Sequence, residues 1–127
     1  MNFAEKLLAL SRAAPFACLS LSELAPVAEV SRLAVFRPGE PIGDGTRPLG
    51  RLLVVVAGAA VDAEDQPLPR VLGASSVLFE QPLPCAVFAS RSAGVSCLAF
   101  KKAHVLTILN ECPGFSTGLL SVVRGGW

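Results

Sequence analysis

The stretch Leu52-Leu53-Val54-Val55-Val56-Ala57-Gly58 is the core of the longest apolar run in the chain, which covers residues 52–61. A short, continuous apolar run rich in β-branched residues is typical of a strand that is buried on both faces. Gly58 interrupts it, and a glycine at such a position indicates a tight bend or a close approach of two backbones. The stretch therefore predicts the central strand of a packed β-structure.

Shorter strand candidates lie on both sides of this run. Large apolar side chains recur at Leu33, Val35 and Phe36 before a Pro38-Gly39 turn, and further candidates follow at residues 71–73, 77–79, 85–89 and 95–99. Several short strands separated by turn residues are typical of an antiparallel barrel or sandwich.

Helical patterns flank the strands. Residues 3–10 carry an apolar stripe, and Ser20-Leu21-Ser22-Glu23 fits a capping box that opens a second helix. A wide apolar face returns over residues 103–109 and ends at Pro113-Gly114, before a last short helix. We therefore expect one α+β domain over residues 1–127. It would contain N-terminal helices (1–31), an antiparallel, jelly-roll-like β-roll of about eight short strands (32–100) and C-terminal helices (101–124).

The composition limits the classes of function. Of 127 residues, 52% are apolar and 17% charged, and the net charge is +1, with no basic cluster larger than Lys101-Lys102. This balance argues against disorder and against nucleic-acid binding. The four cysteines and His104 lack metal-ligand spacing, so we expect free thiols, no metal and a cytoplasmic protein. The longest apolar run is too short to span a membrane.

Five pieces of the sequence, in order, resemble the cyclic-nucleotide-binding domain family of catabolite-activator-type regulators, protein-kinase regulatory subunits and gated channels. They are Pro15-Phe16 with Leu19-Ser20 and Glu23-Leu24; Phe36-Arg37-Pro38-Gly39-Glu40-Pro41-Ile42 with Gly45; the central 52–58 stretch; Leu72-Gly73; and Cys97-Leu98-Ala99-Phe100 with Ala103, Ile108-Leu109 and residues 111–113. The resemblance covers nearly the whole chain and implies the family's β-roll.

The family's ligand cassette resembles F-G-E-x-A-L-L…R-[ST]-A. The resemblance implies that a cyclic phosphate binds at the start of a short helix, where free amides and the helix dipole favour an anion. A glutamate would bind the ribose and an arginine the phosphate. On this pattern Glu80 falls on the glutamate, Phe79 replaces the glycine, and Leu83-Pro84-Cys85 occupies the place of the arginine. Because Pro82 and Pro84 lie in this segment, which is also shorter than the family's, we expect no cassette helix.

The candidate ligand-binding residues are therefore Phe79, Glu80, Cys85, Ala86 and Arg91. Three of them have a simpler interpretation. Glu80 would be a solvated loop carboxylate, Cys85 a buried strand thiol, and Arg91 part of the Ser90-Arg91-Ser92 turn. His104 is expected at the surface. Trp127, after Gly125-Gly126, would be either a docking anchor for a partner or a frayed end.

No catalytic motif is present: there is one histidine and no G-x-S-x-G or Walker loop, so we expect no enzyme and no catalytic residues. Two hypotheses remain. In the first, the chain is a regulatory domain that has lost or weakened cyclic-nucleotide binding and acts through a protein partner or as a homodimer. In the alternative, it is a sensor of cAMP, cGMP or another small ligand with an altered pocket. Because the chain ends soon after its last helix begins, any output would come from a separate partner.

Overall fold

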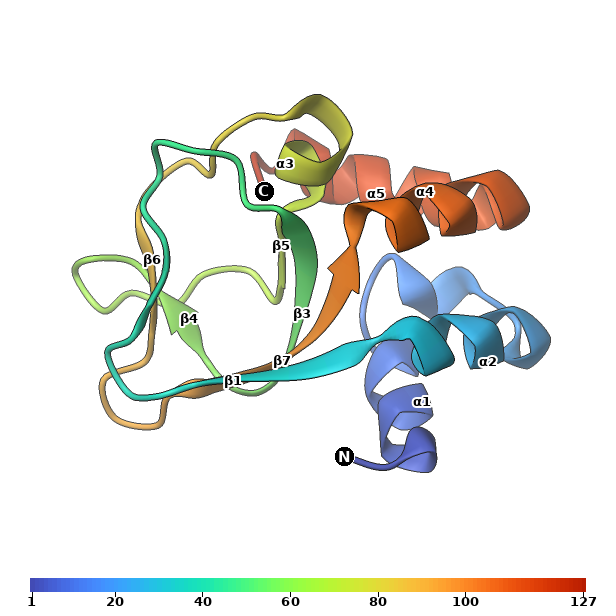
Figure 1. The fold of residues 1–127 in the computed structure, drawn as a ribbon, viewed down its shortest axis with the longest axis horizontal. Helices are drawn as coiled ribbons and strands as arrows, with labels where there is room; N and C mark the ends of the chain where they lie inside the picture. Colours follow the sequence, from blue (N-terminus) through green and yellow to red (C-terminus); the bar gives the residue numbers. More distant parts are fainter.

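The computed structural model describes all residues, 1–127, and Figure 1 shows a β-roll with helices gathered at one end. The helices are α1 (Phe3–Ser11), the 3-10 helix η1 (Phe16–Cys18), α2 (Leu21–Val30), α3 (Ala74–Phe79), α4 (Lys102–Glu111) and α5 (Pro113–Arg124). The strands are β1 (Arg32–Phe36), β2 (Pro41–Gly43), β3 (Arg51–Gly58), β4 (Ala60–Val61), β5 (Val71–Leu72), β6 (Val87–Ala89) and β7 (Val95–Lys101).

Two antiparallel sheets form the roll. One has the strand order β1-β7-β3-β5 and the other the order β2-β6-β4. The long strands β3 and β7 lie at the centre of the first sheet and pair from Arg51 opposite Lys101 to Gly58 opposite Val95. The predicted α+β fold, an antiparallel β-roll with helices at both ends of the chain, is confirmed, with seven strands.

The central strands are buried on both faces, as the 52–58 stretch predicts. Leu52 and Val54 of β3 belong to a core cluster with the flanking helices, whereas Leu53 and Val55 belong to a second cluster inside the roll. Successive side chains of a strand point to opposite faces, so an uninterrupted apolar sequence supplies both clusters. Gly58 has a φ of +71°, and an added Cβ would lie 2.2 Å from the carbonyl oxygen of Gly94. The close backbone approach expected there is present.

The helices are joined to the sheet by three phenylalanines from distant parts of the chain. Phe16 of η1 stacks on Phe100 of β7, with ring centroids 5.3 Å apart, and its centroid lies 5.0 Å from that of Phe115 in α5. The predicted capping box of α2 is confirmed, because Ser20 accepts from the amide of Glu23 and the Glu23 carboxylate accepts from the amide of Ser20. None of the helices is long and apolar enough to cross a bilayer.

The prediction of a strand at residues 77–79 is wrong, and so is the expectation that no cassette helix forms. Residues 77–79 are not a strand but the end of α3, a helix that was not expected. The prolines invoked against it, Pro82 and Pro84, both follow its last residue, Phe79, so neither removes one of its hydrogen bonds. A short helix is therefore present between β5 and β6 after all (Figure 1).

Candidate functional site

The start of α3 is built around a glycine in a left-handed conformation. Gly73 has φ +96° and ψ 5°, and an added Cβ would lie 2.4 Å from the carbonyl oxygen of Arg51. Only glycine fits such a position without displacing the backbone of β3. The close contact restricts the turn from β5 into α3 to glycine.

Those amides bind the end of the chain. The Gly73 amide donates to the main-chain carbonyl oxygen of Trp127 at 2.9 Å, and the Ser75 amide donates to the same oxygen at 3.3 Å. The first amides of a helix have no partner within the helix, and here an oxygen from outside supplies one. Figure 1 shows the end of the chain lying against α3.

The interior of the roll beside this contact is filled by apolar side chains. Leu53, Leu72 and Val87 are fully buried, and Leu83 is 3% exposed. The half-buried Trp127 packs against this cluster from the side of α5. Tight packing of this kind leaves the inner wall of the roll in contact with the chain's own residues.

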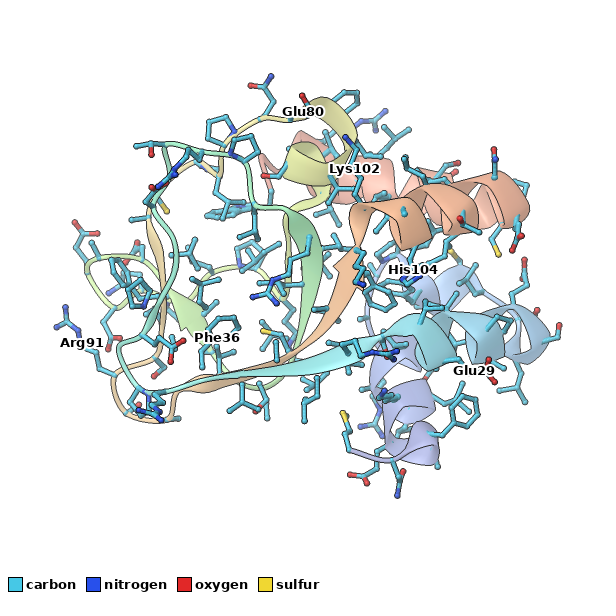
Figure 2. The ribbon with its side chains drawn as sticks, viewed as in Figure 1. Glu29, Phe36, Glu80, Arg91, Lys102 and His104 are labelled. Carbon is cyan, nitrogen blue, oxygen red and sulfur yellow. The ribbon has the colours of Figure 1, made fainter.

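The predicted site residues Phe79 and Glu80 lie at the far end of α3. Glu80 is the C-cap residue, with φ +54°, and not the residue beside the first amides. Its carboxylate accepts from Nζ of Lys102 at 3.2 Å, and the two side chains are 75% and 47% exposed. An exposed pair of this kind contributes little to stability. Figure 2 shows Glu80 beside Lys102 at the outer edge of the molecule, and the Phe79 side chain is 54% exposed.

The structure does not bring the other three predicted residues to α3 as a group. Cys85 and Ala86 pack their backbone against Gly45, where an added Cβ would lie 2.8 Å from the Cys85 carbonyl carbon. Burial raises the pKa of the Cys85 thiol, and the carboxylates of Asp62 and Glu64 raise it further. Figure 2 places Arg91 at the end of the roll opposite Glu80. Its side chain is exposed and borders a separate surface hollow with Gly39 and Phe88.

Sequence reasoning missed the residues that the structure does bring together: Gly73, Ser75 and Trp127. Leu72-Gly73 is one of the five pieces that resemble the family, and α3 begins directly after it. Trp127 is not frayed, since its backbone and its half-buried ring both contact the domain. The signal in the sequence was Gly125-Gly126 followed by the chain's single tryptophan.

A pocket of about 270 Å³ lies between α2 and α4, away from α3. His104 lines it together with Val27 and Ile108, and the Nδ1 atom of His104 is buried without a hydrogen-bond partner. The expectation of a surface histidine is therefore only partly correct, because the ring is half-buried. No group of three His, Cys, Asp or Glu side chains is arranged to hold a metal ion.

Comparison with known proteins connects the chain to solved structures. The sequence matches no family model and no curated protein. The fold is similar to that of the catabolite activator protein of Thermus thermophilus, with a TM-score of 0.69 and 16% identity over 86% of this chain. It is also similar to the N-terminal domain of a transcriptional regulator from Streptomyces coelicolor A3(2), with a TM-score of 0.65 and 23% identity, covering 91% of this chain and 87% of that one.

These similarities confirm the expected fold, an antiparallel β-roll with flanking helices. The chain spans about half of the catabolite activator protein, 55% of its length. At such low identities the likeness concerns the fold, and function has to be argued from the site.

Proposed function

We propose that this chain is a non-catalytic regulatory domain of the cyclic-nucleotide-binding type in which nucleotide binding is lost or weakened, and that it acts through a protein partner. The observation that carries the proposal is the pair of hydrogen bonds from Gly73 and Ser75 to the carbonyl oxygen of Trp127. In the family that the sequence resembles, a cyclic phosphate binds at the start of the short helix. Here an oxygen of the chain itself lies at that place.

The residues around α3 support the same conclusion. With Gly73 taken as the cassette glycine, the residue after it, Ala74, stands where the family pattern has the ribose-binding glutamate. Ala74 is fully buried and offers no acceptor. When the cassette is taken to begin at Gly73, its segment is no longer shorter than the family's. The shortening came from placing the cassette glycine at Phe79.

The phosphate-binding arginine has no counterpart in this segment. Leu83, in the stretch that occupies its place, is buried in the apolar cluster of the roll. A charge-assisted hydrogen bond is worth about 1.5–3 kcal/mol. Its loss alone would weaken binding about tenfold to a hundredfold, since 1.4 kcal/mol corresponds to a factor of ten.

Exposed apolar side chains favour a protein partner or a second copy of the chain. Val35 on the edge strand β1 is 65% exposed, and Leu106 of α4 and Leu120 of α5 are 45% and 46% exposed. Such exposed apolar side chains are available for burial against another protein surface. We place the domain in the cytoplasm, where its four free thiols would stay reduced.

Thermal unfolding with and without millimolar cAMP, cGMP or a cyclic dinucleotide tests the loss of binding. A ligand at about 100 times its Kd stabilises the folded state by roughly 2.7 kcal/mol and moves Tm by several degrees. We expect no shift with any of the three nucleotides, and AMP serves as the control for non-specific effects.

A shift of several degrees with one nucleotide would contradict the proposal and support the alternative, a sensor with an altered pocket. Repeating the measurement with Glu80→Ala then shows whether the exposed Glu80 takes part. Sedimentation of the chain over a range of concentrations distinguishes a homodimer from a domain that needs a different partner.

A further inference from the structure

The chain turns back sharply after α5. The Gly126 amide donates to the Val123 carbonyl at 2.9 Å and the Trp127 amide to the Val122 carbonyl at 3.3 Å, while Gly126 has a φ of +91°. This is a Schellman motif, which ends a helix with a glycine in the left-handed region and reverses the chain. The reversal directs the carbonyl of Trp127 to the start of α3 and brings Gly126 close to Pro84.

Trp127 contacts the domain in two ways. Its main-chain oxygen accepts from two α3 amides, and its ring packs on the apolar cluster of the roll. Gly126 lies close to Pro84, since a Cβ added to it would lie 3.4 Å from Cγ of Pro84. The segment joins α5 to α3 and to the loop that follows it. A frayed end would make none of these contacts.

We propose that residues 125–127 form a latch that acts as an internal ligand of the domain. When the latch is docked, it occupies the first amides of α3, covers the apolar cluster beside them and fixes the end of α5 to the β-roll. When it is released, it exposes the indole of Trp127, frees the end of α5 and uncovers the roll. Its role in excluding an outside ligand rests on the proposed function, whereas the docked state rests on the contacts alone.

Two neighbouring glycines provide a matched pair of variants. Gly126 adopts a left-handed backbone conformation that residues other than glycine rarely adopt. Gly126→Ala should therefore favour the released state. Gly125 has an ordinary φ of −76°, so Gly125→Ala should leave the latch docked. Trp127→Ala removes the ring but keeps the carbonyl, and it tests the anchor separately.

Amide hydrogen exchange followed by NMR reports the latch directly. We expect exchange at Gly73 and Ser75 to become about fivefold faster or more in Gly126→Ala and in Trp127→Ala, and to stay unchanged in Gly125→Ala. The Val77 amide, which donates to the Gly73 carbonyl inside α3, is the internal control and should keep its protection in all variants. Unchanged exchange at Gly73 and Ser75 in both releasing variants would overturn the latch.

Adding cAMP to the unmodified chain separates the failure of the latch from the failure of the proposed function. No binding, with faster exchange in the releasing variants, supports both. In a second outcome, cAMP binds, the Gly73 and Ser75 amides lose protection and the fluorescence of Trp127 changes. This outcome would contradict the proposed loss of nucleotide binding but support a latch that a ligand displaces. Binding that leaves this protection and fluorescence unchanged would overturn the role of the latch in excluding ligands.

Discussion

The cysteine side chains show how strongly the surroundings of a single residue set its chemistry. Cys97 lies on β7 between β1 and β3 and is fully buried, whereas Cys18 is exposed. Burial raises the pKa of the Cys97 thiol to about 11, and the guanidinium of Arg51 opposes this only in part. Because the thiolate is the reactive form, Cys97 should be inert near neutral pH.

We predict that a thiol reagent added to the folded chain at pH 7.5 labels Cys18 and not Cys97. At that pH only about one Cys97 thiol in a few thousand is ionised, and the strand pairing on both sides of β7 blocks access as well. Mass spectrometry of the labelled protein measures both sites. In urea, where the fold is lost, Cys97 should react as readily as Cys18.

The control is Cys18→Ser, which removes the fast-labelling site and leaves Cys97 in place. Rapid labelling of Cys97 in the folded variant would show that β7 opens without global unfolding, in conflict with its central position in the sheet.

At the scale of secondary-structure elements, the packing of α5 against the N-terminal segment depends on one glycine. An added Cβ at Gly118 would lie 2.4 Å from Cβ and 2.7 Å from Cα of Pro15. Alanine is the better helix former by about 1 kcal/mol, so helix propensity and packing act in opposite directions here. The clash involves a ring and a backbone atom that cannot rotate away.

We predict that Gly118→Ala lowers the free energy of unfolding by about 1–3 kcal/mol, as overpacking in a core does. Urea unfolding at constant pH measures the change. Gly114→Ala on the same helix is the matched control, because an added Cβ there meets only Sγ of Cys18, at 3.9 Å. It should be neutral or slightly stabilising, and a stabilised Gly118→Ala would show that α5 does not pack on Pro15 as described.

The elements that the sequence predicted well are those with a strong local signal. The 52–58 stretch identified β3 by its apolar continuity, and Ser20 with Glu23 identified the start of α2 by its capping chemistry. The helix α3 escaped prediction because residues 74–79 form less than two helical turns and carry no capping side chain. Contacts from distant elements, and not local propensity, hold such a short helix in place.

The candidate site was predicted less well than the fold for a related reason. The family's cassette pattern has a glycine followed by a glutamate. Matched to the sequence alone, this pattern selects Phe79 and Glu80. The feature that locates the helix start is the approach of Gly73, the N-cap of α3, to the carbonyl of Arg51 in β3. The docking of Trp127 on Gly73 is likewise a contact between distant parts of the chain, and no local pattern contains it.

At the scale of the whole molecule, the two core clusters are built on the same strands. Leu98 and Phe100 of β7 belong to the cluster under the helices, while Cys97 and Ala99 belong to the cluster inside the roll. A change on one side of the sheet therefore acts on strands that the other side also needs. The helices are not a separate unit, because Phe16 connects them to Phe100 of the sheet.

We predict from this sharing that Phe16→Ala destabilises the whole chain by about 3–5 kcal/mol, the usual cost of truncating a buried phenylalanine. Helix content, followed by far-UV circular dichroism, and the roll, followed by the NMR amide signals of β6 and β7, should be lost in one coincident transition. Phe79→Ala is the matched control, since Phe79 is 54% exposed and should change the free energy of unfolding by no more than about 0.5 kcal/mol. Loss of the helical signal before the amide signals of β6 and β7 in Phe16→Ala would mean instead that the roll is stable without its helices.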